Sequence, residues 1–157
     1  MEIRRAEKQD IPRLHELLTQ VNGVHAEGRP DLFKMGKRKY SDEQLMTIID
    51  EHEKSPIFVF VDDNDIVLGY CFAIVEQFIN DNNRTDIKTL YIDDICVDEK
   101  YRRQHIAKRL FDFVVDFARS NGFYNITLNV WECNPKARAF YDSCGMKPLK
   151  TCLETIL

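Results

Sequence analysis

Apolar residues recur along the chain with two different periods, and the period predicts where helices and strands lie. After a short opening strand, MEIRRA, a helical period begins near Asp10 and predicts a first helix. The apolar face of this helix comprises Ile11, Leu14, Leu17, Leu18 and Val21. We expect Asn22-Gly23 to end the helix, and residues 24–40, which have no clean period, to form a long loop with a binding role.

A second helix and three strands are expected next. Ser41 begins the helix, because the sequence SDEQ sets a capping serine and a glutamine at the spacing of a capping box. The three β runs are residues 57–61, 66–78 and 86–97. Residues 62–65, DDND, are a hairpin signal, so the three neighbouring strands are expected to form an antiparallel meander.

The last third of the chain predicts one β-α-β crossover. An apolar stripe that begins at Ile106 predicts a helix, which Asn121-Gly122 ends, and residues 125–131 follow as a strand. A crossover of this kind makes its two strands parallel. Ligands in such sheets lie beyond the carboxyl ends of the strands, so a site is expected there.

A final helix and a last strand complete the pattern. Asn134-Pro135 combines a capping side chain with proline at the first helical position, and Cys144-Gly145 closes this helix. Residues 148–157, PLKTCLETIL, are expected to supply the last strand. The whole order is β-α-α-β-β-β-α-β-α-β, which predicts an α/β fold with a mixed sheet.

The stretch YRRQHIAKRL gives the crossover helix a cationic start. The cations are Arg102, Arg103, His105, Lys108 and Arg109. Helix N-termini carry partial positive charge, so acids normally collect there, and the nearest acid inside this helix is Asp112. A phosphate or pyrophosphate bound to the N–H groups and guanidinium groups would resolve the conflict. A solvated basic surface is the alternative, since each misplaced charge costs only about 0.3–1 kcal/mol.

Overall charge and composition exclude several classes of protein. The chain has 157 residues, which suits one domain, and a formal net charge of −4 argues against a surface devoted to nucleic acid. The basic cluster at residues 34–39 lacks interleaved aromatic residues, so we expect no nucleic-acid partner.

The five cysteines are odd in number and form no C-x-x-C pair, which favours reduced thiols and no metal site. The sequence opens without a leader and has no run of about 18 apolar residues. We therefore expect a soluble, cytoplasmic protein with no membrane partner.

Two motifs resemble the GNAT superfamily of N-acetyltransferases. VDEKYRRQHIAKRL is similar to its acetyl-CoA-binding motif, R/Q-x-x-G-x-G/A, with Arg102, His105 and Ala107 in the three signature positions. NPKARAFYDSCGM is similar to the downstream segment N-x-x-A-x-x-F-Y-x-x-x-G-F. The resemblance covers nearly the whole chain. It implies the GNAT fold in a single domain, residues 1–157, with an antiparallel meander, one β-α-β crossover and helices on both faces of the sheet.

The resemblance implies acetyl-CoA as co-substrate, with no metal. Backbone groups of Ile95, Cys96 and Val97 would bind the pantetheine arm, and plain core packing of their side chains is compatible with this role. The pyrophosphate would be wrapped, beside Arg102, by Arg103, Gln104, His105, Ile106, Ala107 and Lys108. Asn134 would contact the cofactor arm, although an N-cap alone explains it.

His105 departs from the family pattern, because glycine is preferred at its position. Glycine lacks a Cβ and lets a diphosphate approach the backbone closely. Either the loop accommodates the imidazole, which then touches phosphate, or the affinity for the cofactor falls. The surrounding cations favour accommodation.

Three residues are candidates for the chemistry. The resemblance makes Tyr141, which is two helical turns after Asn134, the general acid that protonates the CoA thiolate, whereas ordinary packing is the alternative. Asp93 stands where some diamine-acetylating relatives have a carboxylate, so the resemblance makes it the first choice, and Asp94 the second, for a base or water-positioning group. Adjacent strand residues point to opposite faces, so only one can face a cleft unless a bulge re-aims them. Asn129 stands where some protein-acetylating relatives have glutamate, which disfavours that mechanism.

We therefore expect an N-acetyltransferase that moves the acetyl group to a primary amine by direct attack in a ternary complex. A catalytically weak GNAT-like module that binds CoA or a partner is the alternative. The acceptor would be a small-molecule or peptide amine, recognised by residues 24–40, residues 79–86 and the surroundings of Trp131. Isolated histidines such as His15 and His25 are more often structural. Family members are often dimers, so a homodimer stays open beside a monomer.

Overall fold

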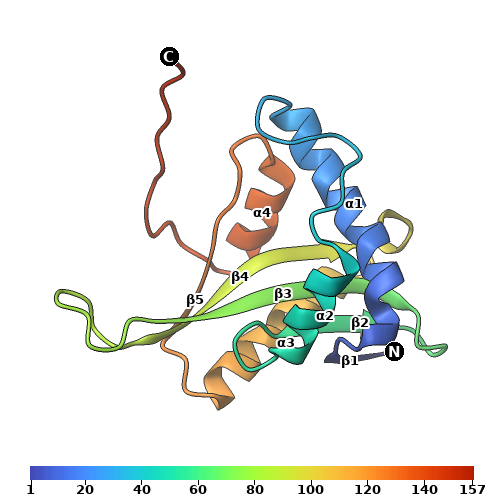
Figure 1. Ribbon diagram of the computed structural model, residues 1–157, viewed down its shortest axis with the longest axis horizontal. Helices are drawn as coiled ribbons and strands as arrows, with labels where there is room; N and C mark the ends of the chain where they lie inside the picture. Colours follow the sequence, from blue (N-terminus) through green and yellow to red (C-terminus); the bar gives the residue numbers. More distant parts are fainter.

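A five-stranded mixed sheet forms the centre of the computed structural model, which describes residues 1–157 (Figure 1). Its strands are β1 (Glu2–Arg5), β2 (Ile57–Val61), β3 (Val67–Gln77), β4 (Lys88–Val97) and β5 (Asn125–Leu128), which lie in this order across the sheet. The first four are antiparallel to their neighbours, and β4 and β5 are parallel. The predicted meander and crossover are confirmed.

Four α-helices and two short 3₁₀ helices accompany the sheet. They are α1 (Ile11–Gly28), α2 (Asp42–Asp50), α3 (Ile106–Ser120) and α4 (Pro135–Ser143), with η1 (Lys8–Asp10) and η2 (Glu99–Tyr101). The predicted capping box begins α2, since Ser41 Oγ accepts a hydrogen bond from Gln44 N and Ser41 N donates to Gln44 Oε1. None of the helices has the length and apolar character needed to cross a membrane.

Two apolar cores place the helices on opposite faces of the sheet. On one face, Leu14 and Leu17 of α1 and Leu45 of α2 pack against β2 and β3. On the other face, Phe111 and Val114 of α3 and residues of α4 pack against β2, β3 and β4. Every residue of β2 is buried, because both faces of this strand are covered.

The first helix is longer than the sequence pattern predicts. Asn22-Gly23 lies inside α1, which continues to Gly28. Glycine inside a helix costs about 1 kcal/mol, and burial of Ala26 in the next turn offsets this cost. The Asn22 amide donates hydrogen bonds to the carbonyls of Lys34 and Lys37, at 2.9 and 3.4 Å, so it holds the following loop instead of ending the helix.

The predicted last strand is absent. Residues 148–157 form no strand and run away from the sheet as an extended tail (Figure 1). A strand requires a ladder of backbone partners, whereas the tail is held by a pair of hydrogen bonds, each 2.8 Å, from the Arg29 guanidinium to the Glu154 carboxylate. The strand of residues 125–131 is also shorter than predicted, because β5 ends at Leu128.

Candidate active site

A β-bulge at Asp93 re-aims the side chains of β4. Phe72 of β3 lies opposite Asp94 and Ala73 lies opposite Ile92, so Asp93 is an extra residue in β4. Leu90 and Ile92 face α3 and α4, but after the bulge Cys96, another even-numbered residue, faces α1. The bulge therefore reverses which residues face each side, and Asp93 and Asp94 both point to the α1 face.

The same position marks the place where β5 leaves β4. The two strands pair from Thr89–Asn125 to Ile92–Leu128 and no further. Beyond this point, the β5-facing edge of Ile95, Cys96 and Val97 has no strand partner, so backbone N–H and C=O groups on that edge are free to bind another chain or ligand. The main-chain role of these three residues stays a prediction, and the open edge supports it.

The turn between β4 and α3 is fixed by a buried carboxylate. Asp98 accepts a hydrogen bond from Lys100 N at 2.9 Å and forms an ion pair with Arg13 of α1. Arg103 and His105 then adopt left-handed backbone angles, with φ of 64° and 60°. His105 is the residue before α3 and makes no side-chain cap. The left-handed backbone at His105 explains why glycine suits this position, because residues with a Cβ rarely adopt that conformation.

The cationic helix start is largely without acidic partners. α3 has no acid in its first turn, and Arg103 forms no ion pair. Arg102 Nε donates a weak hydrogen bond to the Val97 carbonyl at 3.4 Å. Lys108 is the exception, because its Nζ lies 2.5 Å from Asp112 Oδ1. An anion at this turn would meet exposed guanidinium groups directly and would compete with Asp112 for Lys108.

The remaining predicted residues of the turn differ in exposure. Gln104 and His105 are exposed, Ala107 is half-buried, and the Ile106 side chain lies in the core beside Leu110. Only the main chain of Ile106 is therefore available to a ligand.

The two aspartates differ in environment. Asp94 accepts a hydrogen bond from the Tyr70 hydroxyl at 2.9 Å. Burial raises the pKa of Asp94 to about 6, although the Lys39 charge and the Tyr70 hydrogen bond oppose this rise. Asp93 is partly exposed, and its Oδ2 lies 2.8 Å from Lys39 Nζ and 3.4 Å from the Tyr40 hydroxyl. A partly exposed carboxylate paired with Lys39 thus lies beside a second carboxyl group whose pKa is raised.

Tyr141 lies on the buried side of α4. Its ring packs against Phe111 and Phe140, with centroids 6.4 and 5.2 Å away. Its hydroxyl has no partner within the chain, yet the only fully buried side-chain polar atom without a partner is His15 Nδ1. The Tyr141 oxygen therefore reaches accessible space. Burial and nearby anionic groups, including Asp94, raise the pKa of Tyr141 well above its usual value, so the hydroxyl keeps its proton.

α4 begins and ends beside the elements of the candidate site. Asn134 accepts a hydrogen bond from Ala137 N at 3.1 Å, which confirms the predicted N-cap. Burial raises the pKa of Cys144 and the Lys108 charge opposes this rise, so the start of α3 lies near the end of α4. The role of Asn134 toward a cofactor stays a prediction.

An aromatic cluster joins α1 to the segment after β5. Phe33 lies 5.1 Å from His25 and 5.3 Å from Trp131, measured between ring centroids. Burial and the charge of Lys39 both lower the pKa of His25. Sequence reasoning assigned the isolated His25 no role and missed Phe33, Lys39 and Tyr40 individually. The only signal in the sequence was the length of their loop.

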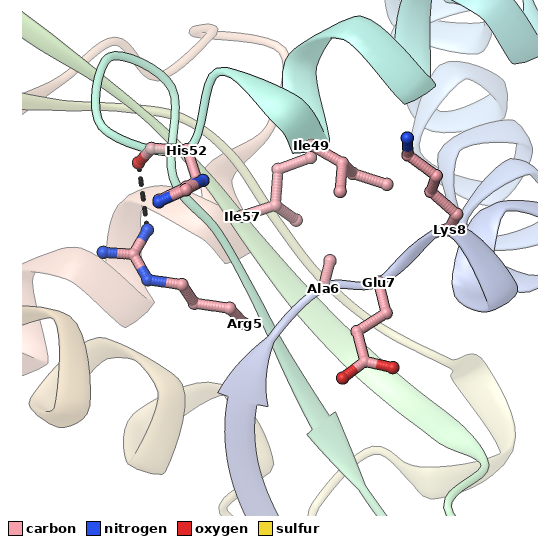
Figure 2. A pocket seen from close by; sticks show the side chains of 7 residues that line it. All are labelled: Arg5, Ala6, Glu7, Lys8, Ile49, His52 and Ile57. Carbon is pink, nitrogen blue, oxygen red and sulfur yellow. Dashed lines mark hydrogen bonds between the residues drawn. The ribbon is translucent and has the colours of Figure 1, made fainter.

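Asn129 follows β5 directly, and its amide donates a hydrogen bond to the Tyr91 hydroxyl of β4 at 3.1 Å. A separate hollow of about 330 Å³ lies between β1 and the residues that follow α2 (Figure 2). It contains none of the predicted site residues, and at one end of it Arg5 donates a hydrogen bond to the His52 carbonyl at 2.9 Å. The bulge and the cationic turn, not this hollow, form the candidate site.

Comparison with known proteins gives a consistent result. The family described as "Acetyltransferase (GNAT) family" matches residues 11–146. Glucosamine 6-phosphate N-acetyltransferase from Arabidopsis thaliana is 26% identical over 109 residues, which are 69% of this chain and 62% of that protein. N-acetyltransferase 8 from Homo sapiens is 27% identical over 127 residues, covering 75% of this chain and 54% of that protein. The chain therefore spans less than two thirds of the length of these curated relatives.

The same architecture occurs among solved structures. The crystal structure of a mutant BH1408 protein from Bacillus halodurans is 31% identical, with a TM-score of 0.94 over 100% of this chain and 99% of that chain. The predicted fold is confirmed over its whole length, apart from the last strand described above.

We predict that His105→Gly raises the free energy of unfolding relative to His105→Ala by about 1 kcal/mol, because alanine keeps the Cβ that strains a left-handed residue and glycine does not. Urea denaturation of both variants and the parent measures this. If His105→Ala is as stable as His105→Gly, backbone strain at this turn is negligible.

We also predict a pH-dependent stability from Asp94. Its pKa is about 6 in the folded chain and 3.8 ordinarily, so the folded state holds this proton more tightly and the free energy of unfolding falls as pH rises from about 4 to about 6. Over this range the free energy of unfolding falls by about 2 kcal/mol, because one unit of difference in pKa corresponds to about 1.4 kcal/mol. Asp94→Asn should remove this fall, whereas Asp116→Asn, an exposed control, should keep it. Urea denaturation across this pH range, with the same fall in both variants, would contradict the assignment.

Proposed function

The chain belongs to the GNAT acetyltransferase family, and from this premise we propose that it transfers the acetyl group of acetyl-CoA to a primary amine by direct attack in a ternary complex. One observation carries the proposal. The pairing of β4 with β5 ends at the bulge at Asp93, so a carboxylate, a free backbone edge and a cationic turn follow one another along β4 and its continuation.

Each part of acetyl-CoA has a matching group in the chain. The pantetheine arm has amide groups, and the free edge of Ile95–Val97 offers the N–H and C=O groups with which they pair as an added strand would. The pyrophosphate is anionic, and the turn at Arg102–Lys108 offers backbone N–H groups of the α3 start with flanking cations. The thioester at the end of the arm then lies toward Asp93.

The proposed chemistry uses Asp93 of β4 as the base and Tyr141 of α4 as the acid. The acceptor ammonium loses its proton to Asp93, directly or through water, and the neutral nitrogen attacks the thioester carbonyl. The new N–C bond forms, and the C–S bond breaks as the tetrahedral intermediate collapses. Tyr141, which keeps its proton at neutral pH, donates that proton to the departing thiolate. The new amide nitrogen loses its surplus proton to solvent and the Tyr141 hydroxyl regains one, so one proton is released for each acetyl group transferred.

Asp94 acts through its neighbour Asp93, the proposed base. Its carboxyl group lies on the same face of β4 as Asp93, and the Tyr70 hydroxyl fixes it by a hydrogen bond. Asp94 is therefore a positioning residue.

A second candidate function is a GNAT-like module that binds CoA without efficient transfer. His105 favours it, because the strained turn carries a side chain where a diphosphate would approach the backbone. Lys108 favours it as well, because Asp112 already neutralises its charge. The free Tyr141 hydroxyl favours the enzyme.

Reversal of two cations should separate cofactor binding from general charge effects. We expect Arg102→Glu together with Lys108→Glu to weaken acetyl-CoA binding at least tenfold, or about 1.4 kcal/mol, because two favourable contacts with phosphate become repulsive. Isothermal titration and thermal shift with acetyl-CoA measure this. Arg119→Glu together with Lys54→Glu makes the same change in net charge at exposed positions and should bind like the parent. Equal affinity of both double variants would contradict the assigned phosphate site.

Loss of one hydroxyl should test the acid. We expect Tyr141→Phe to lower kcat about 100-fold with little change in the dissociation constant of acetyl-CoA, because general acid catalysis contributes about this much or more and the ring still packs. Thiol release with a panel of amines, together with calorimetric binding, measures both quantities. Tyr124→Phe, an exposed control, should behave as the parent. A Tyr141→Phe enzyme as fast as the parent at every pH would remove Tyr141 from the mechanism.

A further inference from the structure

A lysine of the chain itself lies beside Asp93, where the amine of an acceptor would bind according to the proposed function. Lys39 Nζ lies 2.8 Å from Asp93 Oδ2, the carboxylate proposed as the base. The side chain is 39% exposed, so it is neither buried in the core nor free in solvent. It enters from the connection between α1 and α2, which is the segment expected to recognise the acceptor.

The segment that carries Lys39 is fixed on both sides. The neighbouring Tyr40 ring stacks on Phe72, with centroids 6.0 Å apart and planes 11° from parallel, and its hydroxyl lies 3.4 Å from Asp93. Further back, Asn22 of α1 holds the carbonyls of Lys34 and Lys37. The position of Lys39 is therefore set by the packing of its loop and does not depend on the ion pair alone.

Lys39 differs from the other lysines of the same loop. Lys34 and Lys37 form no ion pair, whereas Lys39 faces Asp93 and Asp94 of β4, His25 of α1 and the adjacent Tyr40. Burial alone would lower the pKa of Lys39, but the hydrogen bond to Asp93 and the charges of both aspartates raise it. At rest the amine is thus an ammonium, hydrogen-bonded to the group that would remove its proton.

We propose that Lys39 is an internal acetylation site of this protein. The inference rests on the proposed function, because that function brings the thioester to the Asp93 end of β4, where Lys39 Nζ is the nearest amine of the chain. The Lys39 loop then acts as a tethered acceptor that reacts when no external amine displaces it.

The reaction balances with acetyl-CoA as the only co-reactant. Asp93 takes one proton from the Lys39 ammonium, and Nζ attacks the thioester carbonyl. The N–C bond forms and the C–S bond breaks, so the products are Nε-acetyl-lysine, CoA as the thiol and one proton released to solvent. Acetylation removes the positive charge of Lys39, so the ion pair with Asp93 is lost and the carboxylate is left free for an external ammonium.

One peptide allows the three lysines to be compared directly. Chymotrypsin cleaves after Phe33 and Tyr40, and the fragment of residues 34–40 carries Lys34, Lys37 and Lys39 together. The full chain is incubated with acetyl-CoA and no added amine, and fragment mass spectrometry follows the acetyl occupancy of each lysine with time. We expect Lys39 to be acetylated at least tenfold faster than Lys34 or Lys37, at a rate independent of protein concentration.

Two controls separate enzymatic from chemical labelling. Acetic anhydride, which needs no enzyme, should label the unpaired Lys34 and Lys37 ahead of the paired Lys39. Asp93→Asn should lose the selective labelling of Lys39 by acetyl-CoA while its labelling by acetic anhydride persists, which shows that Lys39 stays accessible. A thermal denaturation midpoint near that of the parent shows that this variant is folded.

The outcomes distinguish this inference from the function beneath it. Equal labelling of the three lysines by acetyl-CoA, or an unlabelled Lys39 in a protein that releases CoA thiol with an added amine, overturns the internal site and leaves the proposed function standing. Absence of both a thermal shift with acetyl-CoA and thiol release with any amine overturns the proposed function and the internal site together.

Discussion

The β-bulge at Asp93 is the constraint on which the rest of the site depends. One extra residue in β4 reverses which residues face each side of the sheet, and it coincides with the point where β5 stops pairing with β4. Without it, Asp93 and Asp94 would face opposite sides of the sheet. The bulge thus supplies the carboxylate pair, and the open backbone edge begins at the same place along β4.

The surrounding structure offsets the cost of two acids on one face of a sheet. Tyr70 donates a hydrogen bond to Asp94, and Lys39 and Tyr40 contact Asp93, so neither carboxyl group lacks a partner. A second concentration of unfavourable features lies at the α3 start, where His105 adopts a left-handed backbone and cations face a helix N-terminus. At these two places the residues are less favourable for stability than their local structure would allow, as is common where a protein binds ligands.

Local signals in the sequence predicted most of the fold. The periods of apolar residues located all four α-helices and all five strands, and the caps at Ser41 and Asn134 formed as their residue types predict. Besides the early end of β5 at Leu128, the errors were at Asn22-Gly23 and at residues 148–157. These two were decided by tertiary contacts, since Asn22 binds the following loop and the tail is tied to Arg29 instead of a sheet edge. A local stop signal or a strand-like composition cannot outweigh such distant partners.

By itself, the sequence determined the order of the elements up to α4 and the cationic turn at Arg102–Lys108, because these depend on residue type and spacing along the chain. The candidate roles of Asp93, Asp94 and Tyr141 came from the resemblance of the sequence to the GNAT family. Only the tertiary structure decided that both aspartates share one face, that the edge of Ile95–Val97 is open, and that Lys39, Tyr40 and Phe33 enter the site. Strand register and loop position depend on contacts between residues far apart in sequence, and their energy is set by packing in three dimensions, which no local pattern contains.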